Sequence, residues 1–313
     1  MKTRLNKNTL ELLKTLADYR ILTPIQITIL HFQSRQLAYR AMRDLAKSGL
    51  VESATRGFGS ARGRPESVLS LSQKGIELLR NEGALDPGIS HGLINGQAFT
   101  HTMEHHLLLN WFRIHVAHIE KVLPDLSNDF ISSISPFHLN ETKSRPLVYE
   151  PSGAANPGEN GFTPDGVFTI GCSERKETLL FFLEIDMGTE PLVSQKSDVG
   201  SVRQKISTYQ DYFRQARYKR YEDHWQAKLE GFRLLFLAPD LTRLTALCRQ
   251  VRSQPPSDFI WVTDQERMFV RGLADAIWAR GGKEDIPPQS ILNSRLCRPS
   301  PIPLPKPYAA RSP

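Results

Sequence analysis

Acidic side chains gather around one apolar segment in the second half of the sequence. Residues 177–186 are predicted as a strand that is buried on both faces, because they contain an unbroken run of large apolar residues. Glu184 and Asp186 are two apart at its end, so they point from the same face. Asp165 enters an earlier strand, and Glu190 follows in the next loop. Carboxylates at one sheet edge are hard ligands for Mg²⁺ or Mn²⁺, and such an ion can activate water and hold a nucleic-acid phosphate.

A lysine follows these carboxylates in a predicted helix that opens at Asp198. Lys205 lies one helical turn before Tyr209, beside an apolar stripe, where it could reach back to the sheet. The stripe is formed by Val202, Ile206, Tyr209 and Phe213.

A second group of chemically capable side chains lies near the amino end. Ser34 is typical of a helix N-cap and Gly49 of a helix end, so residues 34–48 are predicted as one helix. One face, with Ala38 and Leu45, suits packing. The other face carries side chains that can bond base edges or phosphates, namely Arg35, Gln36, Tyr39, Arg40, Arg43 and Lys47.

The elements around this helix have a recognisable order. A helix over 5–19 precedes it, and Thr23 with Gln26 forms a capping box that opens a second helix at Pro24. Strands at 50–52 and 67–71 follow, and Ser72 caps a fourth helix. The turn between the strands, Thr55 to Pro65, is rich in glycine and carries Arg56, Arg62 and Arg64.

This order resembles a winged helix-turn-helix domain. The resemblance implies that helix 34–48 enters the major groove of double-stranded DNA and that the turn grips a phosphate or the minor groove. Charge supports a polyanionic partner: residues 1–83 hold 14 Lys and Arg against 7 Asp and Glu, whereas the remaining residues hold 26 of each. A winged helix that contacts protein instead stays open as an alternative.

Other chemistry is weakly indicated. Residues 100–122 are predicted as a histidine-rich helix, in which His101 to His105 matches H-x-x-E-H, a zinc-peptidase pattern. No further glutamate helix supplies a third ligand, so no metal is assigned there and a packing role is expected. The three cysteines are scattered, which predicts reduced thiols in a cytoplasmic protein without a signal sequence or a membrane span.

After residue 129 the spacing of the apolar residues changes from that of a helix to that of strands. Strands are predicted at 130–139, 163–170, 177–186, 232–237 and 259–262, with a helix over 242–251. The order α-β-β-β-α-β-α-β indicates a mixed sheet flanked by helices. The fold class expected is therefore α+β or α/β, with a winged helix followed by a sheet domain.

The string from Pro164-Asp165 through Glu184-Ile-Asp186 to Lys205 and Tyr209 resembles the replication-relaxation family of bacterial mobile elements. It is also similar, more distantly, to the PD-(D/E)xK nuclease fold. The resemblance covers roughly residues 10–240. It implies a role in plasmid replication, relaxation or transfer. By the nuclease pattern, Asp165 and Glu184 hold Mg²⁺ or Mn²⁺, and Lys205 orients water or stabilises charge.

One departure from the nuclease pattern matters. The pattern places a lysine two residues after the glutamate, where this chain has Asp186. An anion then stands where transition-state charge has to be offset. Three interpretations stay open: an active nuclease that uses Lys205 instead, a non-catalytic descendant that binds DNA or a partner, and carboxylates with a purely structural role in an unrelated domain.

The predicted domains are a winged helix over 1–84, a linker over 85–99, a nuclease-like domain over 100–283 and a proline-rich disordered tail over 284–313. The expected partner is double-stranded DNA, with replication or transfer proteins as further candidates. The sequence has no heptad seam, so it leaves a homodimer open.

Overall fold

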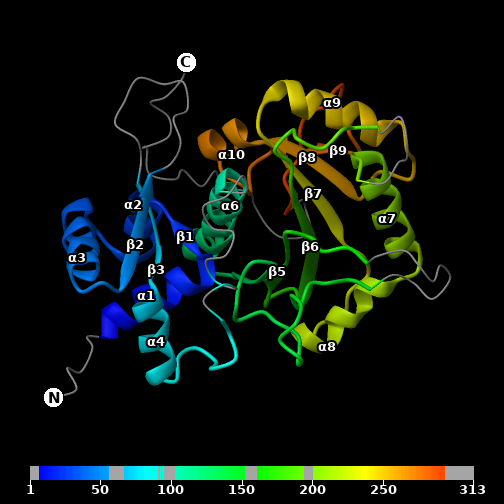
Figure 1. Ribbon diagram of the computed structural model, residues 1–313. Helices are drawn as coiled ribbons and strands as arrows, with labels where there is room; N and C mark the ends of the chain where they lie inside the picture. Colours follow the sequence, from blue (N-terminus) through cyan, green and yellow to red (C-terminus); the bar gives the residue numbers. More distant parts are fainter. Residues whose placement is uncertain are drawn as a thin grey trace. The chain divides into compact units, whose positions relative to one another are not determined.

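The computed structural model describes residues 7–55, 67–90, 92, 94, 103–151, 161–193 and 200–292 (Figure 1). The chain divides into two compact units. The first contains the chain up to Ile114 together with residues 132–163, and the second contains residues 115–131 together with the chain from Pro164 onward. Both units mix helices and strands, as the sequence predicts. No helix within the described ranges is long and apolar enough to cross a membrane.

The N-terminal module, residues 7–81, has the element order predicted for a winged helix. A short strand, β1, was not predicted; it pairs with β3, so the antiparallel sheet has the order β1-β3-β2. The elements are α1 (Lys7–Tyr19), β1 (Ile21–Leu22), α2 (Pro24–His31), α3 (Arg35–Lys47), β2 (Val51–Thr55), β3 (Ser67–Leu71) and α4 (Gln73–Asn81).

Local sequence signals set the helix ends of this module. The Thr23 side chain accepts from the backbone of Gln26, whose own side chain accepts from the backbone of Thr23, which confirms the capping box. Ser34 caps the start of α3. The helix ends just before Gly49, whose backbone has the left-handed conformation with φ +67°. At Gly75, an added Cβ would lie 2.2 Å from the Leu50 carbonyl oxygen, so only glycine allows α4 to pack this closely.

Helix α6 (Met103–Val122) begins in the first unit, where its polar side chains bind the backbone of the N-terminal module. Asn110 donates from Nδ2 to the carbonyls of Tyr19 and Ile21, at 3.1 and 2.7 Å. Arg113 forms an ion pair with Asp18 at 2.5 Å and lies over the Tyr19 ring. These bonds explain why the compact unit extends past the predicted linker over 85–99, in which Leu85, Ile89 and Ile94 are buried.

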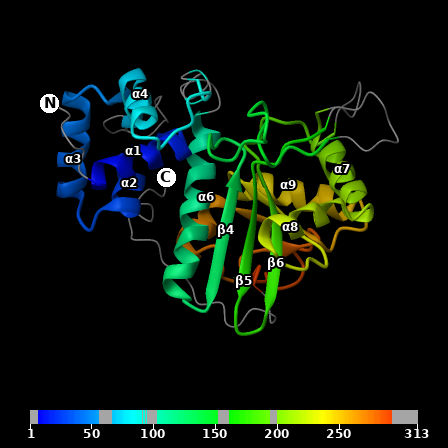
Figure 2. The ribbon, with the colours of Figure 1, turned by 90° about the horizontal axis from the view of Figure 1, so that it is seen from below.

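The second unit contains the larger sheet, whose strand order is β4-β5-β6-β7-β8-β9. Strands β6, β7 and β8 are parallel to one another, whereas β5 runs antiparallel to β6 and β9 runs antiparallel to β8. The strands lie side by side, with α6 alongside β4 (Figure 2). The strands are β4 (Leu126–Ser132), β5 (Gly166–Cys172), β6 (Glu177–Ile185), β7 (Arg233–Ala238), β8 (Ile260–Asp264) and β9 (Ala279–Arg280). The helices that follow α6 are α7 (Val202–Arg214), η1 (Arg217–Arg220), α8 (Tyr221–Trp225), α9 (Leu241–Arg252) and α10 (Gln265–Arg271).

Aromatic side chains pack on both faces of β6. Phe181 stacks on Phe168 of β5 with ring centroids 4.7 Å apart. Phe182 points to the opposite face and meets Tyr209 and Tyr212 of α7 edge-on. Both phenylalanines are fully buried, which confirms the prediction of a strand covered on two sides. Cys172 and Cys248 are free thiols within this core.

Several predicted boundaries were wrong. The first strand of the sheet spans 126–132 and not 130–139. Its start was missed because the polar residues Ser127 to Asp129 give no apolar pattern from which a strand is predicted. The buried stripe of α7 contains Tyr212, whereas Phe213 is only partly buried. The strand predicted at 259–262, which corresponds to β8, is not the last strand, because β9 follows it in the chain and pairs with it. The start of the tail predicted over 284–313 is described, and it is packed: Ser290, Ile291 and Leu292 are buried and Gln289 forms a bridge with Trp278. The tail from 293 onward, Asp198 and the tip of the basic turn lie outside the described residues.

Helix α6 carries a buried histidine in the second unit. His115 is 1% exposed, and neither ring nitrogen has a hydrogen-bond partner among the described residues. Its ring lies edge-on to Phe269 of α10, with centroids 5.7 Å apart. Burial, together with the charge of His118, lowers the pKa of His115 from 6.5 to about 3. Folding therefore requires the neutral form of this side chain.

Replacing His115 by leucine should make the protein less sensitive to acid. The folded-state pKa lies below the ordinary value, so the wild type is unaffected above pH 6.5 and loses stability as the pH falls below it. Between pH 7 and pH 5, we expect the wild type to lose about 2 kcal/mol more of its free energy of unfolding than His115→Leu. Urea denaturation at the two pH values measures this difference, and equal losses would contradict the assignment.

Candidate functional site

Helix α3 separates its residues into two faces. Ala38, Met42 and Leu45 are buried at 0%, 5% and 5% exposure, as predicted. The Lys74 side chain and the Ser72 hydroxyl bond the carbonyls of Ser48 and Gly49 just beyond α3, which fixes the end of the helix. The polar residues predicted to face DNA are all exposed: Arg35, Gln36, Tyr39, Arg40, Arg43 and Lys47.

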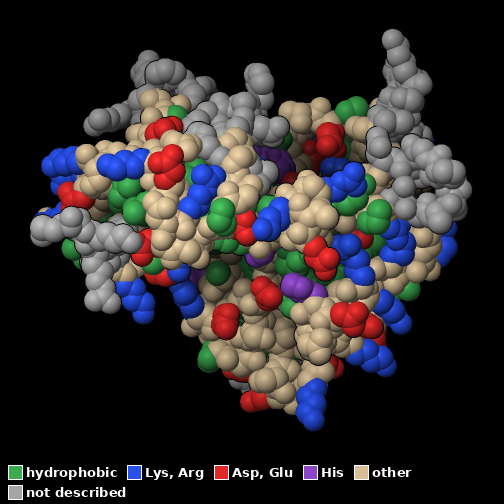
Figure 3. All heavy atoms as spheres, turned by 60° about the horizontal axis from the view of Figure 1, so that its bottom comes forward, with side chains coloured by type: hydrophobic (Ala, Val, Ile, Leu, Met, Phe, Trp, Pro, Cys, Tyr) green, Lys and Arg blue, Asp and Glu red, His purple; other side chains and the backbone are tan. Residues whose placement is uncertain are grey.

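The exposed residues of α3 are predominantly cationic, with Arg35, Arg40, Arg43 and Lys47 against Asp44. Within the described ranges, no carboxylate lies within ion-pair distance of its arginines or of Lys47, although Asp44 is on the same helix. Tyr39 and Leu37 are each about half exposed beside them. Lys and Arg side chains reach the surface over this module on the left of Figure 3. The arginines of the turn (Arg56, Arg62 and Arg64) lie outside the described residues.

The predicted carboxylate group is brought together in the second unit. Glu184 lies one residue before the end of β6 and is 5% exposed. Asp165 lies just before β5, and its Oδ2 accepts from the backbone N–H of Ile185 at 2.7 Å. Helix α7 places Lys205 at 3.0 Å from Glu184 and 3.2 Å from Glu190. The sequence prediction that Lys205 reaches back to the sheet edge agrees with these distances.

Two donors occupy the two oxygens of Glu184. Lys205 Nζ bonds Oε2, and the Tyr209 hydroxyl donates to Oε1 at 2.6 Å. Lys205 and Tyr209 are four residues apart, so they lie on one face of α7. Ser201 caps this helix and thereby fixes where its first turn begins.

Burial dominates the electrostatics of this group. Burial raises the pKa of Glu184, an effect that the charge of Lys205 opposes. Burial alone would lower the pKa of Lys205, but Glu184, Glu190 and Asp165 raise it above its ordinary value. Burial and the neighbouring Glu184 raise the pKa of Tyr209. Lys205 is therefore a cation and Tyr209 a neutral hydrogen-bond donor at neutral pH.

Asp186 has a separate partner that sequence reasoning missed. Its two oxygens accept from Arg243 of α9 at 2.8 and 3.2 Å, in a bidentate pair. Arg243 also donates to the Glu190 carbonyl at 2.7 Å, and the Gly188 N–H donates to Asp186 Oδ1. The anion that replaces the expected lysine is thus neutralised from another helix. Asp240 caps α9 and so sets where the helix that carries Arg243 begins.

The carboxylates of Glu184 and Asp186 are bonded to cations in this arrangement. Glu184 accepts from an ammonium and a phenol, and Asp186 accepts from a guanidinium, so a divalent ion at Glu184 would lie close to the positive charge of Lys205. No group of three His, Cys, Asp or Glu side chains suited to a metal occurs in the part of the chain that the structure describes. His101 of the H-x-x-E-H string lies outside that part.

The chain matches a known protein family over most of its length. A family model described as replication-relaxation matches residues 13–226, a range that begins within α1 and ends just after α8. The chain belongs to the replication-relaxation family. A search of curated proteins found no match. Family membership implies a role in the replication or relaxation of plasmid or mobile-element DNA, and so an interaction with DNA.

Both candidate surfaces of this replication-relaxation protein lie inside the matched segment. The basic face of α3 and the contacts among Glu184, Lys205 and Tyr209 fall between residues 13 and 226. Arg243, which binds Asp186, lies beyond it. The partner of Asp186 was therefore not accessible from the family resemblance.

Removing Lys205 should destabilise the fold. Lys205→Met leaves Glu184 buried without its cation, which should lower the free energy of unfolding at pH 7 by about 3 kcal/mol. Adding Glu184→Gln to this variant removes the orphaned charge and should restore most of that loss. Arg214→Met breaks the exposed pair with Asp211 and should cost less than about 1 kcal/mol. Urea denaturation of the four proteins measures these values; equal effects of the two single changes would refute a buried ion pair.

Proposed function

We propose that this replication-relaxation protein binds double-stranded DNA through α3 and that its second unit is non-catalytic. The observation that carries the proposal is the division of α3, in which one face is buried and the other exposes four cations, a glutamine and a tyrosine. A helix of this kind, held by α2 and a sheet behind it, suits insertion into the major groove. DNA is the partner that family membership implies.

The side-chain chemistry of α3 supports both positioning and base recognition. Arg35, Arg40 and Arg43 can bond guanine or phosphate in a bidentate manner, and Gln36 can bond adenine. Tyr39 and Lys47 suit phosphate oxygens. Arg56, Arg62 and Arg64 are proposed to hold the neighbouring backbone or minor groove, as the turn of a winged helix does. The excess of positive charge within residues 1–83 supports this assignment.

The engagement of the carboxylates supports a non-catalytic second unit. A Mg²⁺- or Mn²⁺-dependent endonuclease, with Asp165 and Glu184 as ligands and Lys205 beside the reacting phosphate, is the rival function. In such an enzyme the divalent ion at Glu184 would lie close to the ammonium of Lys205, and the two positive charges repel each other. A cytoplasmic location, a homodimer and contacts with replication or transfer proteins remain predictions.

Neutralising two arginines of α3 should weaken DNA binding through lost phosphate contacts. For the double variant Arg40→Ala and Arg43→Ala, we expect the slope of log K against log salt to become shallower by about 1.8, or 0.9 for each contact. Fluorescence anisotropy with a labelled duplex measures the slope. The matched control is Lys7→Ala with Lys14→Ala on α1, which should leave it unchanged. An unaltered slope in the α3 variant would remove this face from the interface.

The catalytic alternative is tested with supercoiled plasmid. We expect the purified wild type to bind plasmid but to leave it uncut in the presence of Mn²⁺ or Mg²⁺, because Glu184 is held by Lys205 and Tyr209. Gel electrophoresis detects nicking or linearisation. Cleavage by the wild type that is lost in Glu184→Ala would replace the non-catalytic proposal with the endonuclease.

A further inference from the structure

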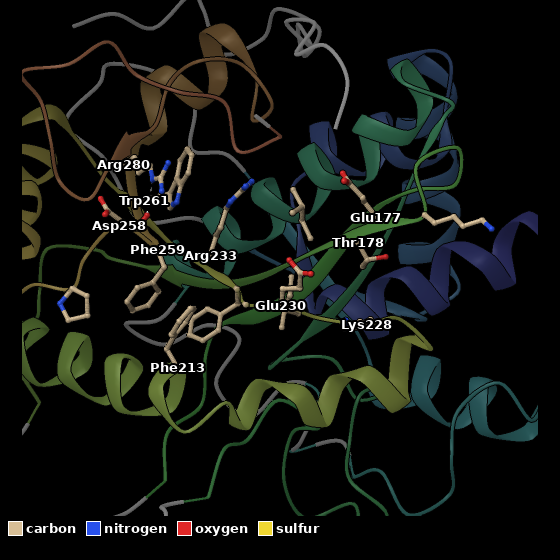
Figure 4. A pocket seen from close by; sticks show the side chains of 16 residues that line it. Glu177, Thr178, Phe213, Lys228, Glu230, Arg233, Asp258, Phe259, Trp261 and Arg280 are labelled. Atoms are coloured by element: carbon tan, nitrogen blue, oxygen red, sulfur yellow. Dashed lines mark hydrogen bonds between the residues drawn. The ribbon is translucent and has the colours of Figure 1, made fainter. Parts of the chain in front are cut away.

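A cavity of about 760 Å³ lies at the amino end of β6, within the second unit (Figure 4). The strand registers and ring contacts divide the residues that line it between the two faces of the sheet. Arg233, Trp261 and Arg280 lie on one face, and Phe213 and Phe259 lie on the opposite face, which α7 covers. A single small ligand therefore contacts one of these groups but not both.

On the first face, the side chains contact one another and the nearby backbone. The guanidinium carbons of Arg233 and Arg280 lie 5.1 and 5.7 Å from the ring centre of Trp261, which is 2% exposed. Arg233 also donates to the carbonyl of Ile291, and the Arg280 Nε donates to the carbonyl of Asp258 at 3.1 Å. Both arginines therefore have structural roles that explain their positions.

An aromatic surface lines the part of the cavity beside α7. The rings of Phe213 and Phe259 stack at 4.8 Å between centroids with an interplanar angle of 29°, and Figure 4 shows them next to each other. Both side chains are only partly buried. Phe232 packs against both, with ring centroids 5.2 and 5.4 Å away, and is 4% exposed. Partly exposed rings that are supported by a buried one form a surface on which a planar base can stack.

A basic segment lies directly beside these rings, where α7 ends. Residues 214–220 carry four cations and no carboxylate, although the chain after residue 83 holds 26 Lys and Arg against 26 Asp and Glu. Arg214 ends α7 and pairs with Asp211 at 2.9 Å. Tyr218 of η1 contacts Phe213, with ring centroids 5.7 Å apart, so η1 adjoins the aromatic surface. The other three cations of the segment lie in η1: Arg217, Lys219 and Arg220.

Helix η1 presents its cations from a fixed position. Tyr218 is 5% exposed, and its hydroxyl donates to the Glu230 carbonyl at 3.1 Å. The guanidinium carbons of Arg217 and Arg220 lie 5.3 and 4.7 Å from the ring centres of two buried tyrosines. Lys219 and Arg220 are exposed to solvent. Arginines that already lie on aromatic rings lose less side-chain freedom when they bind phosphate oxygens.

We propose that η1 and the α7 side of this cavity bind single-stranded DNA. An unpaired base stacks on Phe213 and Phe259, and the neighbouring phosphates of the strand bind Arg217, Lys219 and Arg220. A base inside a duplex cannot stack in this way, because its neighbours cover both of its faces. DNA is the partner that family membership implies. None of these residues lies on α3, so the site can be lost independently of the proposed duplex-binding surface.

The first test measures binding of a labelled single-stranded thymidylate dodecamer to the full-length protein by fluorescence anisotropy. We expect saturable binding, which Phe259→Ala weakens about tenfold because a stacking surface is lost, whereas Phe259→Tyr keeps the ring and binds as the wild type does. For Lys219→Ala with Arg220→Ala, the slope of log K against log salt should become shallower by about 1.4, or 0.7 for each contact.

The matched control is Arg249→Ala with Arg252→Ala on α9, which removes the same charge from two exposed positions. We expect this control to leave the slope for the dodecamer unchanged, because neither side chain belongs to the segment that adjoins the aromatic surface. A slope that falls equally in the control would mean that net charge alone sets the affinity, and would overturn the proposal.

The second test separates this site from α3. The same dodecamer is titrated into the double variant Arg40→Ala with Arg43→Ala, which should bind it as the wild type does whether or not α3 contacts duplex DNA. Loss of dodecamer binding in this variant would assign the single strand to α3 and overturn the proposal. Absence of saturable dodecamer binding to the wild type at low salt, or a wild-type slope in Lys219→Ala with Arg220→Ala, would overturn it as well.

Discussion

The negative charge of a carboxylate buried at the end of a strand has to be balanced by hydrogen-bond donors or a cation. The groups that balance Glu184 organise one end of the larger sheet. A lysine and a tyrosine from a single helix bond its two oxygens. Because both donors come from α7, the helix has one rotational setting in which they reach the strand together. The aromatic packing between Phe182 and Tyr209 uses that same setting. The ion pair and the packing therefore require the same placement of α7 on the sheet.

The two ends of β6 have opposite chemical character. At its carboxyl end, Glu184 and Asp186 are bonded by Lys205, Tyr209 and Arg243. At its amino end, Glu177 has a shielded oxygen without a donor among the described residues, beside a cavity. The end that resembles a nuclease site in sequence is thus the end with the most complete internal bonding. The end without a motif offers open space and polar groups.

Much of the N-terminal module was predictable because its signals are local. The Thr23–Gln26 box and the Ser34 cap each act within three residues, and both are present where the sequence places them. Strand β6 was equally accessible, since an apolar run of this density has to be buried. The start of β4 was not, because Ser127, Asn128 and Asp129 carry no apolar signal.

Contacts between distant segments were beyond sequence reasoning. Arg243 and Asp186 are 57 residues apart, and their pairing depends on α9 packing beside β7 and β8. The cavity depends on strand register, since Glu177, Arg233 and Trp261 come from three different strands. Neither arrangement leaves a spacing pattern in one sequence.

The buried thiols Cys172 and Cys248 of the second unit can be used to detect local opening of the fold. Burial raises the pKa of Cys248 to about 12, so its thiolate is scarce at neutral pH while the fold is closed. Cys172 is buried on β5, across the sheet from α9. Alkylation of either sulfur has to wait for the surrounding elements to separate. Mass spectrometry of the labelled peptides therefore compares how often the regions around β5 and α9 open, without any introduced probe.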